Sequence, residues 1–169
     1  MTHSMSPAEF NALPAPDAER ELLTCNASSA WARAVTAGRP YASLGELREV
    51  AAGAVAALSW PDVRQALDAH PRIGERAAGA GREAAWSRRE QSGAASADEQ
   101  TAAALVEANR AYEDRFGHVF LIFASGKSAD EMLAAARRRL ANDEAAERDV
   151  VRRELTAITL LRLDRLFGT

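Results

Sequence analysis

The stretch EAAERDVVRRELTAITLLRLDRLF, residues 144–167, predicts one long helix and is the strongest single indication of an all-α fold. At about 100° per residue, Val151, Leu155, Ile158 and Leu166 fall on one face of that helix. An apolar stripe of this kind is typical of a helix that is buried along one side.

Arg162 falls in the middle of this apolar stripe. A buried guanidinium needs an anionic partner, because its desolvation otherwise costs several kcal/mol. Two interpretations stay open. Arg162 either forms an internal salt bridge with an Asp or Glu, or holds a substrate carboxylate or carbonyl.

The remaining chain reads as a series of helices with marked starts. Capping-box patterns begin at Ser6, Ser43, Ser87 and Ser128. The expected helices cover residues 7–13, 17–24, 28–37, 44–58, 61–69, 87–95, 98–116, 129–140 and 144–167. Val119–Phe123 is rich in bulky apolar residues, but one such run cannot form a sheet, so we expect a buried connector. The sequence thus predicts a single all-α domain over residues 1–169, a bundle of about eight to nine helices.

Composition and spacing exclude several classes of function. The net charge of −3 offers no basic field for nucleic acid. No stretch approaches the ~18 apolar residues of a membrane helix, and Met1–Leu13 lacks the features of a signal peptide. Cys25 is the single cysteine, and the three histidines lack a metal-binding spacing. We expect no metal, nucleic-acid or membrane partner.

His70 stands at the end of a predicted helix and opens the irregular segment PRIGE. A lone histidine is more often structural than catalytic. Here the following Pro71 fixes the direction of the backbone, and a glycine-containing loop follows instead of an apolar stripe. Loops held between rigid helices are favoured places for chemistry, so His70 is a candidate catalytic residue.

Ser87, Glu90 and Gln91 form a second constellation, because spacings of three and four residues bring side chains to one side of a helix. One interpretation is a capping box without further function. The other is a helix N-terminus whose free N–H groups bind a substrate, beside a glutamate that orients a histidine. The two interpretations are compatible.

Two further features favour structural interpretations. Asn109 shares an apolar face with Leu105 and Tyr112, and we expect its amide to hold a backbone loop, most simply the 117–127 segment. The run Ala124–Ser128, ASGKS, lacks the first glycine of a phosphate-binding loop, and it reads as a turn that opens the next helix.

Four segments together resemble the 2-oxo-4-hydroxy-4-carboxy-5-ureidoimidazoline (OHCU) decarboxylases. Ala69–Glu75 looks like the family's His-Pro motif, and Ser87–Ser92 resembles its Ser-x-x-Glu-Gln segment. Asn109–Ser128 resembles a third block, and Ile158–Leu163 is similar to the family's last helix. The four segments stand in the right order and span almost the whole chain.

The resemblance implies an all-α homodimer that works without metal or organic cofactor on a small-molecule substrate. His70 would be the catalytic acid, and Glu90 its carboxylate partner. Peroxisomal relatives end in a targeting tripeptide that residues 166–169 do not match, so a cytoplasmic enzyme is expected. The residues expected to line the substrate are Pro71, Ser87, Arg88, Arg89, Gln91, Ile122, Phe123, Ala124, Ser125, Gly126 and Arg162.

The implied reaction removes carbon dioxide from OHCU to give (S)-allantoin in urate and purine degradation. The conjugated C=N of the ring can accept the electron pair, so no external electron sink is required. Backbone N–H groups at the start of the 87–95 helix and in 122–126 would stabilise the developing charge. His70 would deliver the proton, since an imidazole pKa of ~6.5 lies near working pH.

Two alternatives belong to other classes. A hydrolase acting on a related ureido compound could use His70 and Glu90 on water, and it would turn over without releasing carbon dioxide. A non-catalytic helical interaction module would instead show an exposed apolar groove.

Overall fold

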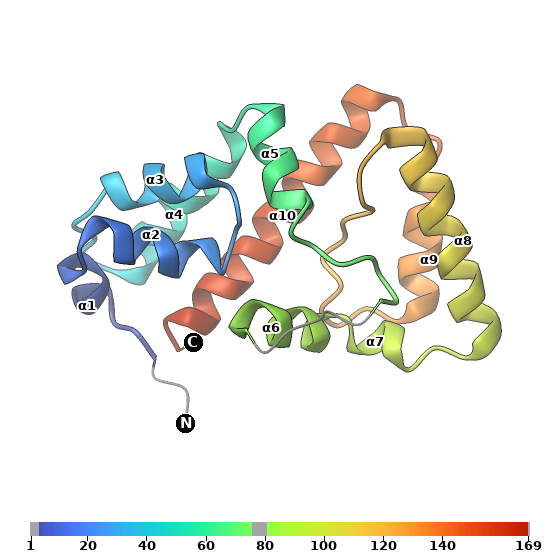
Figure 1. Cartoon of the computed structure of the whole chain (residues 1–169), viewed down its shortest axis with the longest axis horizontal. Helices are drawn as coiled ribbons and strands as arrows, with labels where there is room; N and C mark the ends of the chain where they lie inside the picture. Colours follow the sequence, from blue (N-terminus) through green and yellow to red (C-terminus); the bar gives the residue numbers. More distant parts are fainter. Residues whose placement is uncertain (1–3, 76–80, 169) are drawn as a thin grey trace. The chain divides into compact units, whose positions relative to one another are not determined.

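The computed structural model describes residues 4–75 and 81–168, and within these residues every regular element is a helix (Figure 1). Eight of the ten helices have seven or more residues, so the predicted all-α fold is confirmed. The helices are α1 Pro7–Ala12, α2 Ala15–Leu23, α3 Ser29–Ala37, α4 Leu44–Ala56, α5 Trp60–Leu67, α6 Arg82–Glu90, α7 Ser92–Ala95, α8 Glu99–Phe116, α9 Ala129–Arg139 and α10 Glu144–Leu166.

Three of the four predicted caps start helices as expected. Ser6 and Ser128 form complete capping boxes at α1 and α9. Ser43 caps α4 through its hydroxyl, which accepts from the N–H of Glu46 at 3.2 Å. The Glu46 carboxylate accepts from Ala42 instead of completing the box at Ser43.

The fourth predicted cap, Ser87, is wrong. α6 begins five residues earlier, after Gly81, and Ser87 lies in its last two turns. Ala84 and Trp86 are both buried, and alanine has the highest helix propensity. The helix therefore gains burial by starting before the serine, and the expected 87–95 helix is replaced by α6 and the short α7.

The chain forms two compact units, each with its own core. The first combines residues up to Ala66 with residues from Thr156 onward, and Figure 1 shows α1–α4 gathered within it. Its buried Trp31 donates from the indole N–H to the carbonyl oxygen of Ala51 at 3.1 Å. Phe10 and Phe167 pack edge to face, with ring centroids 5.8 Å apart.

The second unit spans Leu67–Leu155, and α8 and α9 lie side by side within it (Figure 1). The fully buried side chains of Tyr112, Phe120 and Met132 are at the centre of its core. The predicted connector at 119–123 is confirmed as an irregular segment. α10 is one continuous helix that contributes residues to both units, and a single domain over residues 1–169 stays a prediction.

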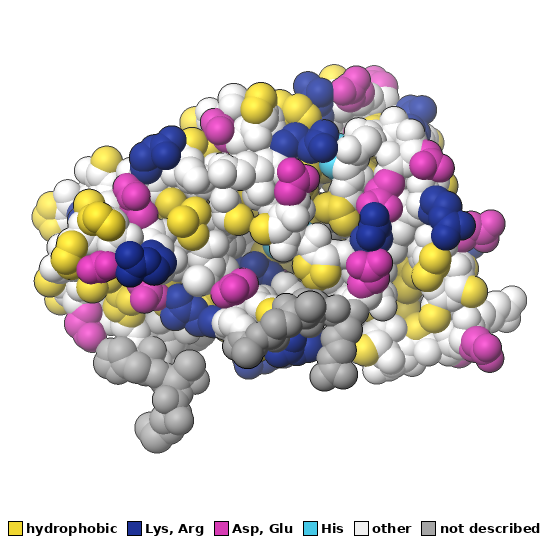
Figure 2. Space-filling view, in the orientation of Figure 1, with side chains coloured by type: hydrophobic (Ala, Val, Ile, Leu, Met, Phe, Trp, Pro, Cys, Tyr) yellow, Lys and Arg dark blue, Asp and Glu magenta, His cyan; other side chains and the backbone are white. Residues whose placement is uncertain are grey.

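The surface agrees with the balanced composition. Figure 2 shows Lys and Arg side chains interspersed with Asp and Glu over the visible face. Among the described helices, none combines the length and the apolar character that crossing a bilayer requires.

Candidate active site

The His-Pro motif lies in an irregular segment directly after α5. The N–H of His70 donates to the carbonyl oxygen of Leu67 at 3.0 Å, which closes the end of the helix. His70 and Pro71 are both half-buried. The predicted break after the helix is thus confirmed, although residues 76–80 of the expected loop lie outside the described residues.

Two side chains fix the backbone just beyond the motif. The Asn109 amide donates from Nδ2 to the carbonyl oxygen of Ile73 at 2.7 Å, and the N–H of Gly74 donates to Oε1 of Gln91 at 3.2 Å. Gly74 takes a φ of 94°, in the left-handed region that favours glycine. Asn109 therefore holds a loop, as expected, but the predicted loop at 117–127 is the wrong one.

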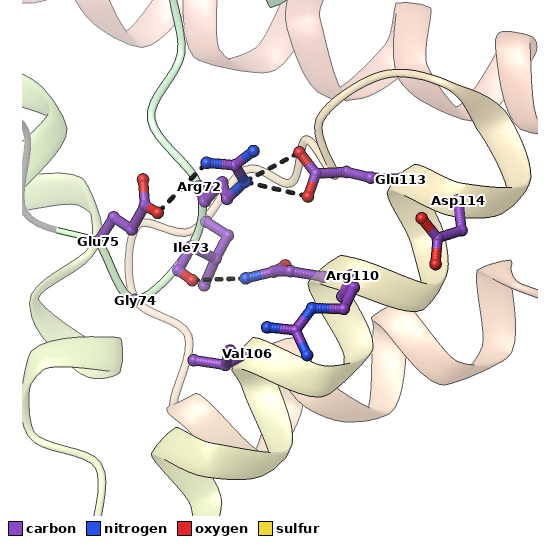
Figure 3. A pocket seen from close by; sticks show the side chains of 9 residues that line it. Arg72, Ile73, Gly74, Glu75, Val106, Arg110, Glu113 and Asp114 are labelled. Atoms are coloured by element: carbon purple, nitrogen blue, oxygen red, sulfur yellow. Dashed lines mark hydrogen bonds and ion pairs between the residues drawn. The ribbon is translucent and has the colours of Figure 1, made fainter.

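An ion pair also ties this loop to α8. Arg72 donates from Nε to both carboxylate oxygens of Glu113, at 2.9 and 3.0 Å, and from Nη1 to Glu75 at 3.3 Å (Figure 3). The hydrogen bond from Arg72 to Glu113 and the negative charge of Glu113 raise the pKa of Arg72 above its ordinary value. The guanidinium therefore stays charged.

The Ser-x-x-Glu-Gln segment forms the end of α6. Ser87 and Glu90 are buried, with 7% and 6% of their surfaces exposed. Arg88 is half-buried and Arg89 is exposed. Gln91 ends the helix, and its N–H donates to the carbonyl oxygen of Ser87 at 3.0 Å.

This position corrects the expected role of the backbone at Ser87–Glu90. Only the first four N–H groups of a helix lack an intrahelical partner, and in α6 these belong to residues 81–84, because the N–H of Ala85 already donates to the carbonyl oxygen of Gly81. The N–H groups of Ser87–Glu90 are inside the helix, so the expected substrate contact at a helix N-terminus is wrong. The end of α6 presents carbonyl oxygens instead.

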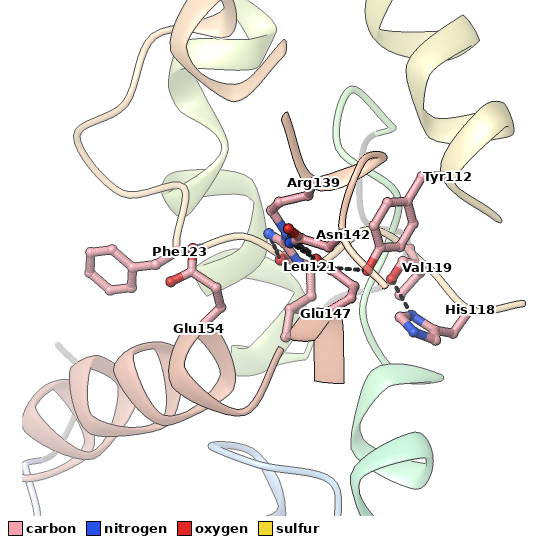
Figure 4. Close-up of polar contacts among 9 residues, drawn as sticks. All are labelled: Tyr112, His118, Val119, Leu121, Phe123, Arg139, Asn142, Glu147 and Glu154. Carbon is pink, nitrogen blue, oxygen red and sulfur yellow. Dashed lines mark hydrogen bonds and ion pairs between the residues drawn. The ribbon is translucent and has the colours of Figure 1, made fainter. Parts of the chain in front are cut away.

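The third segment, 119–124, runs without regular secondary structure through the core of the second unit. Phe120, Leu121, Ile122 and Ala124 are all buried. Arg139 of α9 donates from Nη1 to the carbonyl oxygen of Leu121 at 2.7 Å (Figure 4). A buried side chain thus supplies a hydrogen bond that a helix or sheet would otherwise provide.

Arg139 is itself held by a buried carboxylate. Its guanidinium donates to Glu147 from Nε at 2.9 Å and from Nη2 at 2.6 Å, and only 1% of Glu147 is exposed. The hydroxyl of Tyr112 and the amide of Asn142 also donate to Glu147 (Figure 4). Burial, together with the hydrogen bond to Glu147, raises the pKa of Tyr112. Tyr112 therefore stays protonated and remains a donor.

The backbone of Phe123 is occupied on both sides. Its N–H donates to Oε1 of Glu154 at 3.3 Å, and its carbonyl oxygen accepts from Nζ of Lys127 at 2.7 Å. The N–H of Phe123, one of the groups expected to bind the substrate, thus has a partner on α10 (Figure 4). Ser125 is half-buried, and Gly126 forms an exposed turn with a φ of 78°.

α7 follows the second segment along the chain and lies against the third segment in space. Gly93 lies so close to the carbonyl oxygen of Lys127 that a Cβ at this position would overlap it. Ile73, Ala94 and Ile122 belong to the same buried core cluster. The structure therefore brings the His-Pro loop, the region after α6 and the 119–127 segment together in one unit.

A hollow of about 330 Å³ lies beside the His-Pro loop and the region after α6, and Arg88 and Gln91 are among its lining residues, together with Gly74 and Ser92. Arg162 belongs to the other unit, where it is buried on α10 with 5% exposed, and its role as a substrate contact stays a prediction. Within the described residues, no cluster of three or more His, Cys, Asp or Glu is placed to hold a metal ion.

Sequence reasoning did not identify Arg139, Glu147 or Glu154 as important residues. A signal for the first two exists in the helical periodicity. Arg139 continues the buried face that contains Met132 and Ala136, and Glu147 lies one turn before Val151 of the apolar stripe. A charged residue at each of two apolar positions indicates a buried ion pair.

Similarity to known proteins also supports the family resemblance seen in the four sequence segments. A family model described as OHCU decarboxylase matches residues 11–164. The chain is 32% identical over 134 residues to the 2-oxo-4-hydroxy-4-carboxy-5-ureidoimidazoline decarboxylase of Amia calva, covering 78% of this chain and 77% of that protein. It is 31% identical over 157 residues to the uric acid degradation bifunctional protein TTL of Arabidopsis thaliana, covering 89% of this chain but 47% of the plant protein. It thus spans about half of that relative.

A solved structure gives the same result for the fold. The crystal structure of an OHCU decarboxylase in the presence of (S)-allantoin matches with a TM-score of 0.77 and 27% sequence identity. The match covers 88% of this chain and 98% of that one.

Proposed function

Since this chain belongs to the OHCU decarboxylase family, it is a carboxy-lyase of urate degradation that converts OHCU to (S)-allantoin, and we propose that His70 is its proton donor and Glu90 the carboxylate partner of that histidine. Pro71, the Ser87–Gln91 segment and the Ile122–Gly126 segment line the substrate in this proposal.

The observation that carries the proposal is the shared core of the second unit. Ile73 follows His70-Pro71 by two residues, Ala94 follows Glu90 by four, and Ile122 lies within the third segment. Because all three side chains are buried in one cluster, the segments that hold them are neighbours. This is the arrangement that a site built from these segments requires.

The position of Glu90 at the end of α6 favours a cationic partner. The carbonyl oxygens at a helix C-terminus carry partial negative charge, and a buried carboxylate adds a full one. Such surroundings stabilise an imidazolium and disfavour a substrate anion. Glu90 is therefore better suited to hold protonated His70 than to bind the substrate carboxylate.

The chemistry can be written in two steps. The bond between the ring carbon and the carboxylate breaks, carbon dioxide leaves, and the electron pair moves into the conjugated C=N of the imidazoline. The imidazolium of His70 then gives a proton to one face of the ring. The neutral imidazole that remains takes up a new proton from water. Delivery to one face produces the single (S) enantiomer, and general acid catalysis of this kind contributes typically ~10²–10⁴-fold.

The partnership is tested by a double-mutant cycle on turnover of OHCU generated in situ from urate. We expect His70→Ala and Glu90→Gln each to lower kcat by about 10²–10⁴-fold while the helical circular dichroism is kept. The double variant should lose no more than His70→Ala alone, because residues that act as a unit are not additive. Additive losses, or a Glu90→Gln variant with wild-type kcat, would contradict the pairing.

Four finer expectations from the sequence are part of the proposal. Arg162 contacts an anionic group of the substrate, so Arg162→Ala raises KM. The enzyme forms a homodimer, which sedimentation can measure. It works in the cytoplasm. It also needs no added cofactor, and the activity of extensively dialysed, metal-free protein tests this independence.

A further inference from the structure

α8 contacts the loop that follows His70 through two residues on one face of the helix. Asn109 and Glu113 are four residues apart, so their side chains project from the same side of the helix. Asn109 binds the carbonyl oxygen of Ile73, and Glu113 binds the guanidinium of Arg72. The two contacted residues are consecutive, and His70 precedes them by two positions.

Apolar packing does not fill the space on this side of the loop. A hollow of about 490 Å³ lies between the loop and α8, and Arg72, Ile73, Asn109 and Glu113 all line it (Figure 3). The side chain of Ile73 packs in the core, while polar contacts hold the backbone of the loop beside this hollow. The contact from Asn109 is buried, and breaking it would leave the Ile73 carbonyl without its donor, which is costly in a buried position.

We propose that Asn109, Glu113 and Arg72 form a positioning clamp that holds the backbone after His70, so that the imidazole stands at a fixed place when it donates its proton. The clamp rests on the proposed role of His70. Proton transfer requires hydrogen-bond reach, and small displacements of a catalytic group are costly in rate. The clamp residues act through His70 and do not touch the substrate.

The exposed half of the clamp gives the cleaner test, because 53% of the Arg72 side chain and 26% of the Glu113 side chain are exposed and their variants should fold. We expect Arg72→Ala and Glu113→Ala each to lower kcat by about fivefold. The double variant should lose no more than the worse single variant. KM should change less than about twofold, because the clamp does not contact the substrate.

Asn109→Ala should lower kcat further, by about 10- to 100-fold, because its contact is buried. Since this substitution also disturbs the core, the decision rests on the exposed pair. Glu144→Ala is the matched control. It breaks an exposed ion pair with Arg148 on α10, away from the loop, and kcat should stay at the wild-type value.

His70→Ala measured in parallel separates the two proposals. If His70→Ala is inactive while Arg72→Ala and Glu113→Ala keep wild-type kcat, the clamp is refuted and the proposed function stands. If folded His70→Ala turns over at the wild-type rate, the proposed function fails, and the clamp fails with it. Losses that appear in KM and not in kcat would also overturn the clamp.

Discussion

Glu147 is an acidic residue that is almost completely buried. Its carboxylate accepts hydrogen bonds from Arg139, Tyr112 and Asn142, and it has almost no contact with solvent. The same guanidinium holds the carbonyl oxygen of Leu121. The position of the 119–124 segment therefore depends on a residue in another helix, α10.

Glu147→Ala should lower the free energy of unfolding by about 3–5 kcal/mol, because it leaves the Arg139 charge buried without its carboxylate. Urea denaturation followed by circular dichroism measures this loss. Glu144→Ala is the control on the same helix, where an exposed pair with Arg148 is worth at most about 1 kcal/mol. Equal losses in the two variants would refute the structural role assigned to Glu147.

Single residues were predictable from the sequence where a local pattern marked them. The His70-Pro71 motif and the caps at Ser6 and Ser128 are patterns of this kind. The role of Asn109 was predicted in kind, as a residue that holds a loop, but its partner was wrong. A partner 36 positions away is brought close by tertiary packing, which local residue spacing does not predict.

At the scale of elements, α8 has an N-terminus that depends on ionisation. Its cap is Asp98, whose carboxylate accepts from the N–H of Thr101 at 2.7 Å. This hydrogen bond to the backbone holds the pKa of Asp98 below its usual range. The ionised cap therefore stabilises the folded state above the unfolded pKa of about 3.9, and this contribution is lost as the pH falls through the lower folded value.

The expected outcome is a pH-dependent difference between wild type and Asp98→Asn. Wild type should have the larger free energy of unfolding at neutral pH, and the difference should disappear as the pH falls below about 4. Ser28→Ala is the control, since this cap of α3 has no titrating group and its cost should not change with pH. A difference for Asp98→Asn that stays constant into acid would contradict the account.

Most helices could be predicted as elements, because their periodicity and caps agree. The failure at α6 has a physical reason. Ser87 and Glu90 have the spacing of a capping box. Burial of Ala84 and Trp86, however, stabilises a helix that begins before Ser87, so Ser87 lies inside α6. Burial is a property of the folded chain, so a local capping signal could not reveal it.

At the scale of the whole molecule, the sequence could mark candidate segments for the site but not how these segments meet. The family resemblance selected the segments around His70, Glu90 and Ile122. Ile73 and Ala94 are buried in their common core, and neither residue was predicted as a core residue from the sequence. The comparison with OHCU decarboxylases confirms the family and the fold.

The role of His70 is best tested by measuring carbon dioxide release and allantoin chirality together, for wild type and for His70→Ala. With wild type we expect rapid carbon dioxide release and a single (S) product. With the folded variant we expect turnover lowered by about 10²–10⁴-fold and racemic allantoin. Formation of (S)-allantoin by folded His70→Ala at the wild-type rate would contradict the assignment of His70 as the proton donor.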